Sequence, residues 1–262
     1  MIHSSSVVDK NSKINKNVKI GPFCYIGPNV ELGDGVELVS NVHIEGNTKI
    51  GEKTKIFPFA CIGTQPQDLK YKNEKNSTEI GKENLIREYV TINPGTEGGG
   101  SKTIIGNKCL FMISCHIGHD CHIGNNVIIA NNVPVGGHVT IEDSVVVGGN
   151  SAIQQFTRIG RLAMIGGMTG VLKDVIPFGL SLGNRNHLQG INLIGLRRKN
   201  YENKKIMDLN KAYKEIFSSS NLYENLKKIN NIYSDNELVK EVINFIEKDK
   251  KRPICSPLNK QE

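Results

Sequence analysis

Aliphatic residues recur at every sixth position along most of the chain. One register runs from Val8 to Ile62, a second from Ile80 to Ile92 and a third from Ile105 to Val171. A glycine often follows the aliphatic residue, and a small residue or valine usually stands four positions after it. Such hexads are typical of a triangular coil, in which three hexads of six residues complete one turn. We therefore predict an all-β solenoid, a left-handed parallel β-helix, with the aliphatic side chains inside and glycine easing each turn.

Two segments break this register, from about Gln65 to Glu79 and from about Glu97 to Thr103. Loops expelled from a rigid solenoid commonly carry function. The hexads stop near Pro177, and apolar residues then follow at helical spacing. We predict a catalytic β-helix over residues 1–178 and a small α-helical domain over 179–262 that covers the last coil. The predicted helices span residues 190–200, 204–218, 222–233 and 236–248.

Composition bears on the core and on location. The 262 residues include no Trp and few other aromatic residues, so the core is expected to consist of Ile, Val and Leu. No basic-then-apolar secretory pattern and no run of 18 apolar residues occurs. We therefore expect a cytoplasmic protein without an integral membrane segment. Six cysteines are present without a CxxC motif, so no structural zinc site is predicted. Four of them occupy the small position of the hexad and are interpreted as buried hydrophobes: Cys24, Cys109, Cys115 and Cys121.

The net charge of +7 is unevenly distributed. Residues 1–178 carry 17 basic and 16 acidic side chains, whereas residues 179–262 carry 16 and 10. A basic surface in the last third favours an anionic partner, which could be a phosphate group, an acidic carrier protein or nucleic acid. A lysine-rich surface that serves only solvation is an equally simple interpretation.

The densest cluster of reactive side chains is Cys115–His122 (CHIGHDCH). Coils of 18 residues stack about 4.8 Å apart, so side chains 18 residues apart should share one patch. A histidine beside a carboxylate is the usual equipment of a general base, and a glycine there lets a backbone N–H approach a substrate carbonyl. The sequence therefore predicts a catalytic patch, although a single histidine on such a face is more often a solvated residue. Its members are His119, Asp120, Gly137, His138 and Gln155.

Two other classes of protein stay open on these residues. Histidines on adjacent coils could bind zinc, as in hexapeptide-repeat carbonic anhydrases. Those chains are shorter, and the expelled loops and long helical tail fit them poorly. A solenoid scaffold or an ice-binding solenoid would not need a His–Asp cluster, and the sequence shows no regular threonine ladder.

Several longer segments point to one family. They are IGPFCYIGPNVELG (20–33), QDLKY (67–71), IREYVTINPGT (86–96), GGG (98–100), HIGHDCHIGNN (116–126), GGH (136–138), QQF (154–156) and NLIGLRRK (192–199). With them the chain resembles the UDP-N-acetylglucosamine 3-O-acyltransferases, which catalyse the first step of lipid A biosynthesis. The resemblance covers essentially the whole chain, whereas the hexad alone would indicate only a superfamily.

The resemblance implies a role for each matching residue. His119 matches the general base that deprotonates the sugar 3-hydroxyl, Asp120 the carboxylate that supports it, and Gly137 the N–H that faces the thioester oxygen. It implies (R)-3-hydroxyacyl-acyl carrier protein as donor, UDP-N-acetylglucosamine as acceptor and a homotrimer with sites between subunits. It implies no covalent acyl-enzyme, no metal, no organic cofactor and no nucleic acid. The implied substrate contacts are Asp68, Lys70, His116, His138, Gln155, Arg185, Asn192, Arg197 and Arg198.

Gly167 matches the position that measures acyl-chain length in the resembled family. Asn131, Gly149 and Gly167 are 18 residues apart and should stack into a smooth column. Gly167 should lie roughly 13 Å from His119 along the axis, a depth for on the order of ten carbons. A preference for longer donors, such as hydroxymyristoyl, is therefore expected.

Three residues depart from the family pattern, and one related enzyme needs comparison. Gln154 and Arg185 stand where members often have His, and Ile194 stands where several have an acidic residue. These departures bear on nucleotide affinity and leave the base untouched. The related N-acyltransferase of the same pathway shares the coil but typically carries an extra N-terminal domain, whereas hexads begin here by Val8.

Overall fold

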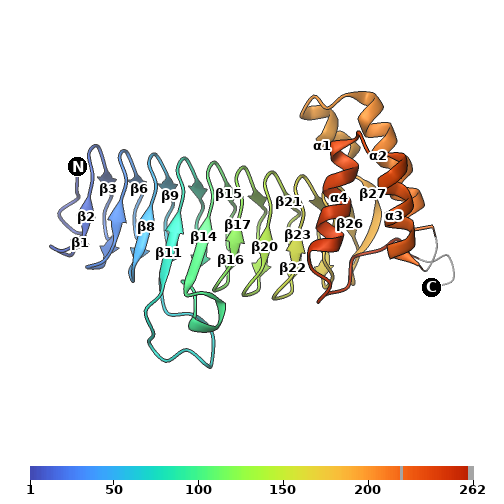
Figure 1. Cartoon of the computed structure of the whole chain (residues 1–262). Helices are drawn as coiled ribbons and strands as arrows, with labels where there is room; N and C mark the ends of the chain where they lie inside the picture. The colour runs from blue at the N-terminus through green and yellow to red at the C-terminus, as the bar shows by residue number, and fades with distance from the viewer. Residues whose placement is uncertain (219–220, 259–262) are drawn as a thin grey trace.

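Stacked coils form a long triangular solenoid with a group of helices at its C-terminal end (Figure 1). The computed structural model describes residues 1–218 and 221–258. Short parallel strands build three sheets, one on each side of the coil. Where no loop intervenes, partners are 18 residues apart, as in the pairing of Val7 with Tyr25 and of His116 with Pro134. The predicted hexapeptide solenoid is confirmed.

The three sheets are called sheets 1, 2 and 3 in the order in which the chain first visits them. Sheet 1 contains β1 (Val7–Val8), β4 (Tyr25–Ile26), β7 (His43–Ile44), β10 (Cys61–Ile62), β13 (Thr91–Ile92), β16 (His116–Ile117), β19 (Pro134–Val135), β22 (Ala152–Ile153) and β25 (Gly170–Val171). Sheet 2 contains β2 (Lys13–Ile14), β5 (Glu31–Leu32), β8 (Thr48–Ile50), β11 (Ser77–Ile80), β14 (Lys102–Ile105), β17 (His122–Ile123), β20 (Thr140–Ile141) and β23 (Arg158–Ile159). Sheet 3 contains β3 (Lys19–Ile20), β6 (Glu37–Leu38), β9 (Lys55–Ile56), β12 (Leu85–Ile86), β15 (Leu110–Phe111), β18 (Ile128–Ile129), β21 (Val146–Val147), β24 (Met164–Ile165), β26 (Gly179–Leu182) and β27 (His187–Ile191).

The core of the solenoid follows the hexad. The aliphatic residue of nearly every hexad is buried, and so is the small residue four positions later. Cys24, Cys109, Cys115 and Cys121 are all buried at that small position. Burial raises the pKa of the Cys115 and Cys121 thiols to about 12, so neither carries a thiolate at neutral pH. Their interpretation as small hydrophobes is confirmed.

The turns between sheets are built differently from the prediction. The left-handed backbone conformation falls on the residue three positions after the aliphatic one, which is usually not glycine, as at Asn17 and Lys53. The hexad glycine lies instead against the neighbouring coil. At Gly21 an added Cβ would collide with the backbone of Val39. The prediction that this glycine eases the turn is therefore wrong, and it is glycine because the next coil leaves no room for a side chain.

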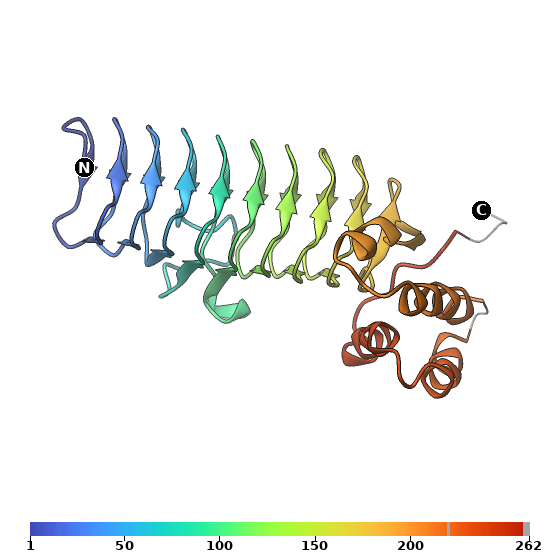
Figure 2. The same ribbon diagram turned by 90° about the horizontal axis from the view of Figure 1, so that it is seen from above.

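Both interruptions leave the solenoid at the same corner. The first lies between β10 and β11, and the second lies between β13 and β14 and contains the short 3₁₀ turn Glu97–Gly99. Each therefore joins a strand of sheet 1 to a strand of sheet 2. Figures 1 and 2 show the two loops together on one side of the solenoid. Their backbones also meet, since Gly95 N–H donates to the Ser77 carbonyl.

The C-terminal part begins as sheet and continues as helix. β26 extends sheet 3 parallel to β24, and β27 pairs with β26 in antiparallel fashion. Four helices follow: α1 (Leu193–Arg198), α2 (Asn203–Ile216), α3 (Leu222–Ile232) and α4 (Glu237–Lys248). The last three match the predicted helices, whereas the first is shorter than residues 190–200 because β27 occupies its start. The predicted boundary after residue 178 thus falls beside a hairpin that joins the sheet. Within the described ranges, no helix has the length and apolarity needed to cross a bilayer.

Candidate active site

His119 and Asp120 lie in the turn between β16 and β17, at the corner of sheets 1 and 2. His119 Nδ1 lies 2.8 Å from Asp120 Oδ2. An ionised carboxylate only accepts hydrogen bonds, so Nδ1 carries the proton and Nε2 of the neutral ring presents a lone pair. The Asp120 side chain is 0% exposed and that of His119 is 13% exposed. The arrangement therefore presents a base at the surface and shields the carboxylate that orients it.

Gly137 lies in the next coil, directly beside the His119 ring. A side chain at this position would collide with His119 Nε2, so only glycine lets the ring lie against this backbone. The Gly137 N–H donates no hydrogen bond within residues 1–218 and 221–258. It is available to a developing oxyanion near the base, as the predicted role requires.

His138 extends the site toward the following coil. Its Nδ1 lies 3.8 Å from Asp120 Oδ2, and its ring meets that of His119 edge to face with centroids 4.9 Å apart. The other side of the ring stacks on Phe156, with centroids 4.3 Å apart. Burial lowers the pKa of His138, which keeps the ring neutral near pH 7. Gln155, beside Phe156, is exposed.

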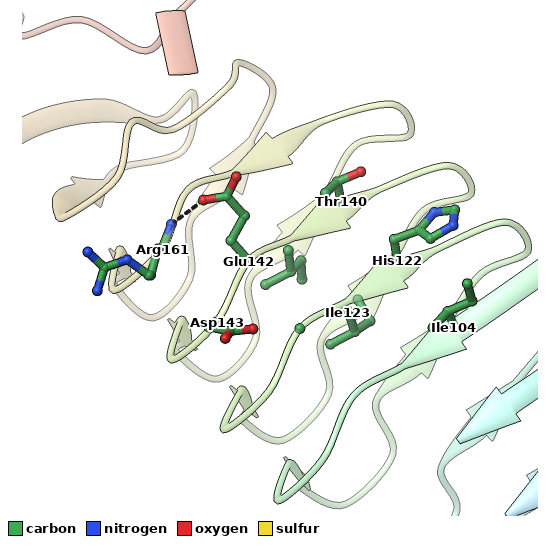
Figure 3. A pocket seen from close by; sticks show the side chains of 9 residues that line it. Ile104, His122, Ile123, Thr140, Glu142, Asp143 and Arg161 are labelled. Carbon is green, nitrogen blue, oxygen red and sulfur yellow. Dashed lines mark hydrogen bonds between the residues drawn. The ribbon is translucent and has the colours of Figure 1, made fainter. Parts of the chain in front are cut away.

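The three histidines of the CHIGHDCH segment do not share one site. His116 on β16 is close to the base, and its Nδ1 lies 2.7 Å from Thr91 Oγ1. Burial, and then the nearby His119, lower the pKa of His116. His122 on β17 instead belongs to sheet 2, where it lines a separate shallow groove of about 410 Å³ (Figure 3).

That groove on sheet 2 has its own polar contacts. Glu142 accepts a hydrogen bond of 2.8 Å from the Arg161 amide, drawn as the dashed line in Figure 3. Burial raises the pKa of Glu142. The Arg161 guanidinium donates two hydrogen bonds to the Glu241 carboxylate of α4, from Nε at 2.8 Å and from Nη2 at 2.6 Å. These contacts attach α4 to the solenoid, so the groove is part of the domain junction.

The first expelled loop brings predicted substrate contacts to the His119 corner. Asp68 and Lys70 line a cleft of about 670 Å³ together with His138 and Phe156. Asp68 Oδ1 accepts a hydrogen bond of 2.9 Å from the Lys70 amide, which shapes the loop. The structure therefore places the two residues predicted for the sugar nucleotide within the same cleft as the His138 ring.

The second expelled loop supplies residues that the sequence analysis missed. The Thr96 amide donates to Asp120 Oδ1 at 2.9 Å, and the Thr96 hydroxyl donates to Asp120 Oδ2 at 2.7 Å. Gly99 packs so closely on Asp120 that a side chain there would overlap the carboxylate. The sequence did contain a signal for this contact. Both interruptions of the hexad register connect sheets 1 and 2, the two sheets that meet at the His119 corner.

Metal ligation was the alternative chemistry for these histidines. Ligand atoms of His119, Asp120 and His138 lie within 4.8 Å of one another. Both Asp120 oxygens, however, already accept hydrogen bonds from Thr96, and His119 Nδ1 donates to Oδ2. A cation at this position would have to replace these bonds. The donor set is therefore arranged for a His–Asp pair and does not fit a metal site.

A second cleft, of about 780 Å³, lies between sheet 3 and α1. Its floor is apolar and includes Ile128, Val146 and Met164, and its rim carries Arg198 and Lys199. We call it the α1 cleft. Of its residues, Asn192 and Arg198 were predicted as substrate contacts and Lys199 was missed.

Asn192 lines the α1 cleft, whereas Arg197 and Arg185 have different surroundings. Asn192 caps α1, since its Oδ1 accepts from Gly195 N and its Nδ2 donates to the Leu162 carbonyl, both at 2.9 Å. Arg197 is exposed and does not line the α1 cleft. Arg185 is exposed in the turn between β26 and β27. Their predicted contacts with substrate stay predictions.

Gly167 lies neither at the His119 corner nor in the α1 cleft. It lies between β24 and β25, at the corner of sheets 3 and 1, whereas His119 lies at the corner of sheets 1 and 2. It stacks on Gly149 as predicted, since an added Cβ would lie 3.3 Å from the Gly149 carbonyl oxygen. A groove that joins Gly167 to His119 would therefore have to cross the outer face of sheet 1 as well as run along the solenoid axis.

Comparisons with known proteins bear on this geometry. A family model described as UDP-N-acetylglucosamine O-acyltransferase, domain 2, matches residues 174–255, and one for bacterial transferase hexapeptide repeats matches 11–46 and 102–137. The acyl-[acyl-carrier-protein]–UDP-N-acetylglucosamine O-acyltransferase of Paracoccus denitrificans is 48% identical over 204 residues, 77% of each chain. That of Nautilia profundicola is 44% identical over 192 residues, 73% of this chain and 74% of the relative. The solved UDP-N-acetylglucosamine acyltransferase of Francisella novicida superposes with a TM-score of 0.95 at 34% identity, covering 99% of this chain and 95% of its own.

This chain belongs to the acyl-[acyl-carrier-protein]–UDP-N-acetylglucosamine O-acyltransferase family. The resemblance drawn from the sequence and the left-handed parallel β-helix are both confirmed. Membership in this O-acyltransferase family also decides against the carbonic-anhydrase, N-acyltransferase and scaffold alternatives.

Three residues depart from the family pattern. Of these, Gln154 accepts a hydrogen bond of 3.2 Å from Arg252, and Ile194 lines the α1 cleft. Arg185, the third, has an exposed side chain.

Proposed function

We propose that the His119 corner is where this O-acyltransferase moves an acyl group from acyl carrier protein to UDP-N-acetylglucosamine, the first step of lipid A biosynthesis. The observation that carries this assignment is the His119–Asp120 hydrogen bond of 2.8 Å beside the Gly137 N–H, which donates no hydrogen bond to any described residue. A base and an oxyanion donor side by side are what acyl transfer to a hydroxyl needs.

In the proposed reaction, His119 Nε2 takes the proton of the sugar 3-hydroxyl as its oxygen attacks the thioester carbon. The Gly137 N–H stabilises the oxyanion of the tetrahedral intermediate. The C–S bond then breaks, and the His119 imidazolium returns its proton to the departing thiolate of the carrier. Asp120 supports the imidazolium through Nδ1 throughout. No covalent acyl-enzyme forms, which agrees with the raised pKa of the buried Cys115 and Cys121 thiols.

We propose that the complete site lies between chains of a homotrimer. The predicted substrate contacts are divided between the His119 corner and the α1 cleft. These two surfaces lie on different sides of the solenoid. Support also comes from the outer face of sheet 3, which is charged at its start and apolar from β12 onward. The apolar outward side chains are Leu85, Leu110, Ile128, Val146, Met164 and Leu180. A continuous apolar face of this kind is suited to burial against a neighbouring chain.

The substrates can be assigned to these surfaces. UDP-N-acetylglucosamine would place its sugar at His116, His138 and the first loop, and its phosphates near cationic groups such as Arg198. The acyl chain would run along an apolar groove toward Gly167. The basic surplus of residues 179–262 suits an acidic carrier protein as the donor.

A substrate panel tests the proposed function. The purified protein is mixed with 3-hydroxyacyl carrier proteins of several chain lengths and with UDP-N-acetylglucosamine, its 3-amino analogue or UDP-glucose. We expect mass spectrometry to find the 3-O-acylated product of UDP-N-acetylglucosamine together with free carrier thiol. Acylation of the amino analogue alone, or no transfer from any carrier, would contradict the proposal.

A further inference from the structure

The loop that leaves the solenoid after β13 returns to the buried carboxylate of Asp120. Thr96 alone makes two hydrogen bonds to it, one from its amide to Oδ1 at 2.9 Å and one from its hydroxyl to Oδ2 at 2.7 Å. Thr96 is 4% exposed and Asp120 is 2% exposed. Two donors on two oxygens fix both the position and the plane of the carboxylate.

A buried carboxylate needs such partners. Taking a charged group out of water is costly unless hydrogen bonds replace its hydration. Besides Thr96, the only other donor to Asp120 within the described ranges at hydrogen-bonding distance is His119 Nδ1. Without Thr96, the carboxylate would keep one strong partner and would be free to rotate away from the imidazole.

The same loop closes the space around this carboxylate. Gly99 packs directly on Asp120, and its backbone does not adopt the left-handed conformation that favours glycine. A glycine is needed there because a methyl group would overlap the carboxylate. The loop is in turn tied to the first one, since Glu74 Oε1 accepts from the Glu97 amide at 3.3 Å.

We propose that Thr96 is a positioning residue of the acyl transfer, which holds the Asp120 carboxylate in place and aimed at His119 Nδ1. The inference rests on the proposed role of His119 as the base. With the carboxylate fixed, Nδ1 keeps the proton and the Nε2 lone pair points to the acceptor hydroxyl. The expelled loop thereby prepares the base before any substrate arrives.

The test compares substitutions that differ by one hydroxyl. Thr96→Val keeps the shape and the amide donor but removes the donor to Oδ2, and we expect kcat to fall roughly tenfold. The KM for UDP-N-acetylglucosamine should change less than about twofold, because Thr96 lines the cleft with a side chain only 4% exposed and its hydroxyl is bonded to Asp120. Thr96→Ser restores the donor and should keep kcat within about twofold of the native value.

A matched control removes a hydroxyl with no role. Thr103, where the same loop rejoins the sheet, is fully buried, and its hydroxyl has no hydrogen-bond partner among residues 1–218 and 221–258. Thr103→Val should therefore leave kcat, KM and the melting temperature essentially unchanged. An equal loss of kcat in Thr103→Val and Thr96→Val would show that loop packing, and not the donor, matters, and would overturn the inference.

A double-mutant cycle separates positioning from structure. In an Asp120→Ala background, Thr96→Val should cause no further loss of kcat, because the group it positions is gone. Gly99→Ala gives a second perturbation of the carboxylate if Thr96→Val melts early, and its loss should also vanish in that background. Additive losses would overturn the inference, as would native kcat in Thr96→Val. Native turnover in His119→Ala would contradict the proposed function itself. Lost turnover in His119→Ala together with native kcat in Thr96→Val would contradict only the role of Thr96.

Discussion

The His119 corner and the α1 cleft are built on the same coils and differ in almost every physical respect. The corner is polar: a buried carboxylate, two histidines of lowered pKa and two expelled loops surround the base. The cleft is apolar on its floor and has Arg198 and Lys199 on its rim. The His119 corner provides groups for proton transfer. The α1 cleft provides an apolar floor and cationic groups that can bind an anion. We propose that neither surface is a complete acyltransferase site alone, and we therefore place the reaction between two chains.

The largest expected effect comes from removing the base of the His119 corner. His119→Ala removes the base, and kcat should fall about a hundredfold or more while the fold persists, since the ring lies at the surface. His122→Ala is the matched control, because His122 comes from the same segment but lies on sheet 2. Steady-state assays and thermal melts of both variants measure the difference. Equal activity of the two would refute the assignment of the base.

A smaller effect is expected from the rim of the α1 cleft. Arg198→Ala should raise the KM for UDP-N-acetylglucosamine about tenfold, with a lesser change in kcat, because a charge-assisted hydrogen bond to a phosphate is lost. Arg197→Ala changes the same charge on the same helix, but Arg197 does not line the cleft. Its effect should be distinctly weaker. Equal losses would indicate that general positive charge, and not the cleft, binds the nucleotide.

The smallest effect concerns selectivity. Among the described residues, a Cβ added at Gly167 comes within 4 Å of the Gly149 backbone alone, at 3.3 Å from its carbonyl oxygen, so we expect Gly167→Met to fold. Each methylene excluded from an apolar groove costs about 0.8 kcal/mol, so exclusion of about two methylenes should lower the ratio of kcat/KM for long over short donors about tenfold. The kcat/KM for short donors serves as the internal control and should stay within about twofold. An unchanged ratio would remove Gly167 from the acyl groove.

Much of the fold could be predicted because the inward aliphatic side chains repeat with the coil. The exceptions depend on contacts that a period does not contain. Asn17 and Lys53 adopt the left-handed turn although neither is glycine, because the coil imposes that conformation at one position of every hexad. Residues 179–191 form strands because the last coil offers β24 as a partner, which no local pattern indicates.

The site shows the same division. His119 beside Gly137, and Asp120 beside His138, follow from the 18-residue period. Thr96 could not be found this way, because it reaches Asp120 from an expelled loop, across 24 residues of sequence. The α1 cleft depends on where the chain turns back after β27, which periodicity does not specify.

Mixing two impaired chains, assayed at a UDP-N-acetylglucosamine concentration well below the native KM, tests most directly whether the site is shared. One chain carries His119→Ala, and the other carries Arg198→Ala with Lys199→Ala, so each keeps the surface that the other has lost. If each site joins the corner of one chain to the cleft of its neighbour, every mixed trimer contains one native site out of three, so the doubly purified protein should show about one third of native activity. Co-expression with two affinity tags, followed by assay of the doubly purified protein, measures this. Activity no higher than the mean of the two single variants would show that each chain holds its own complete site and would contradict the account.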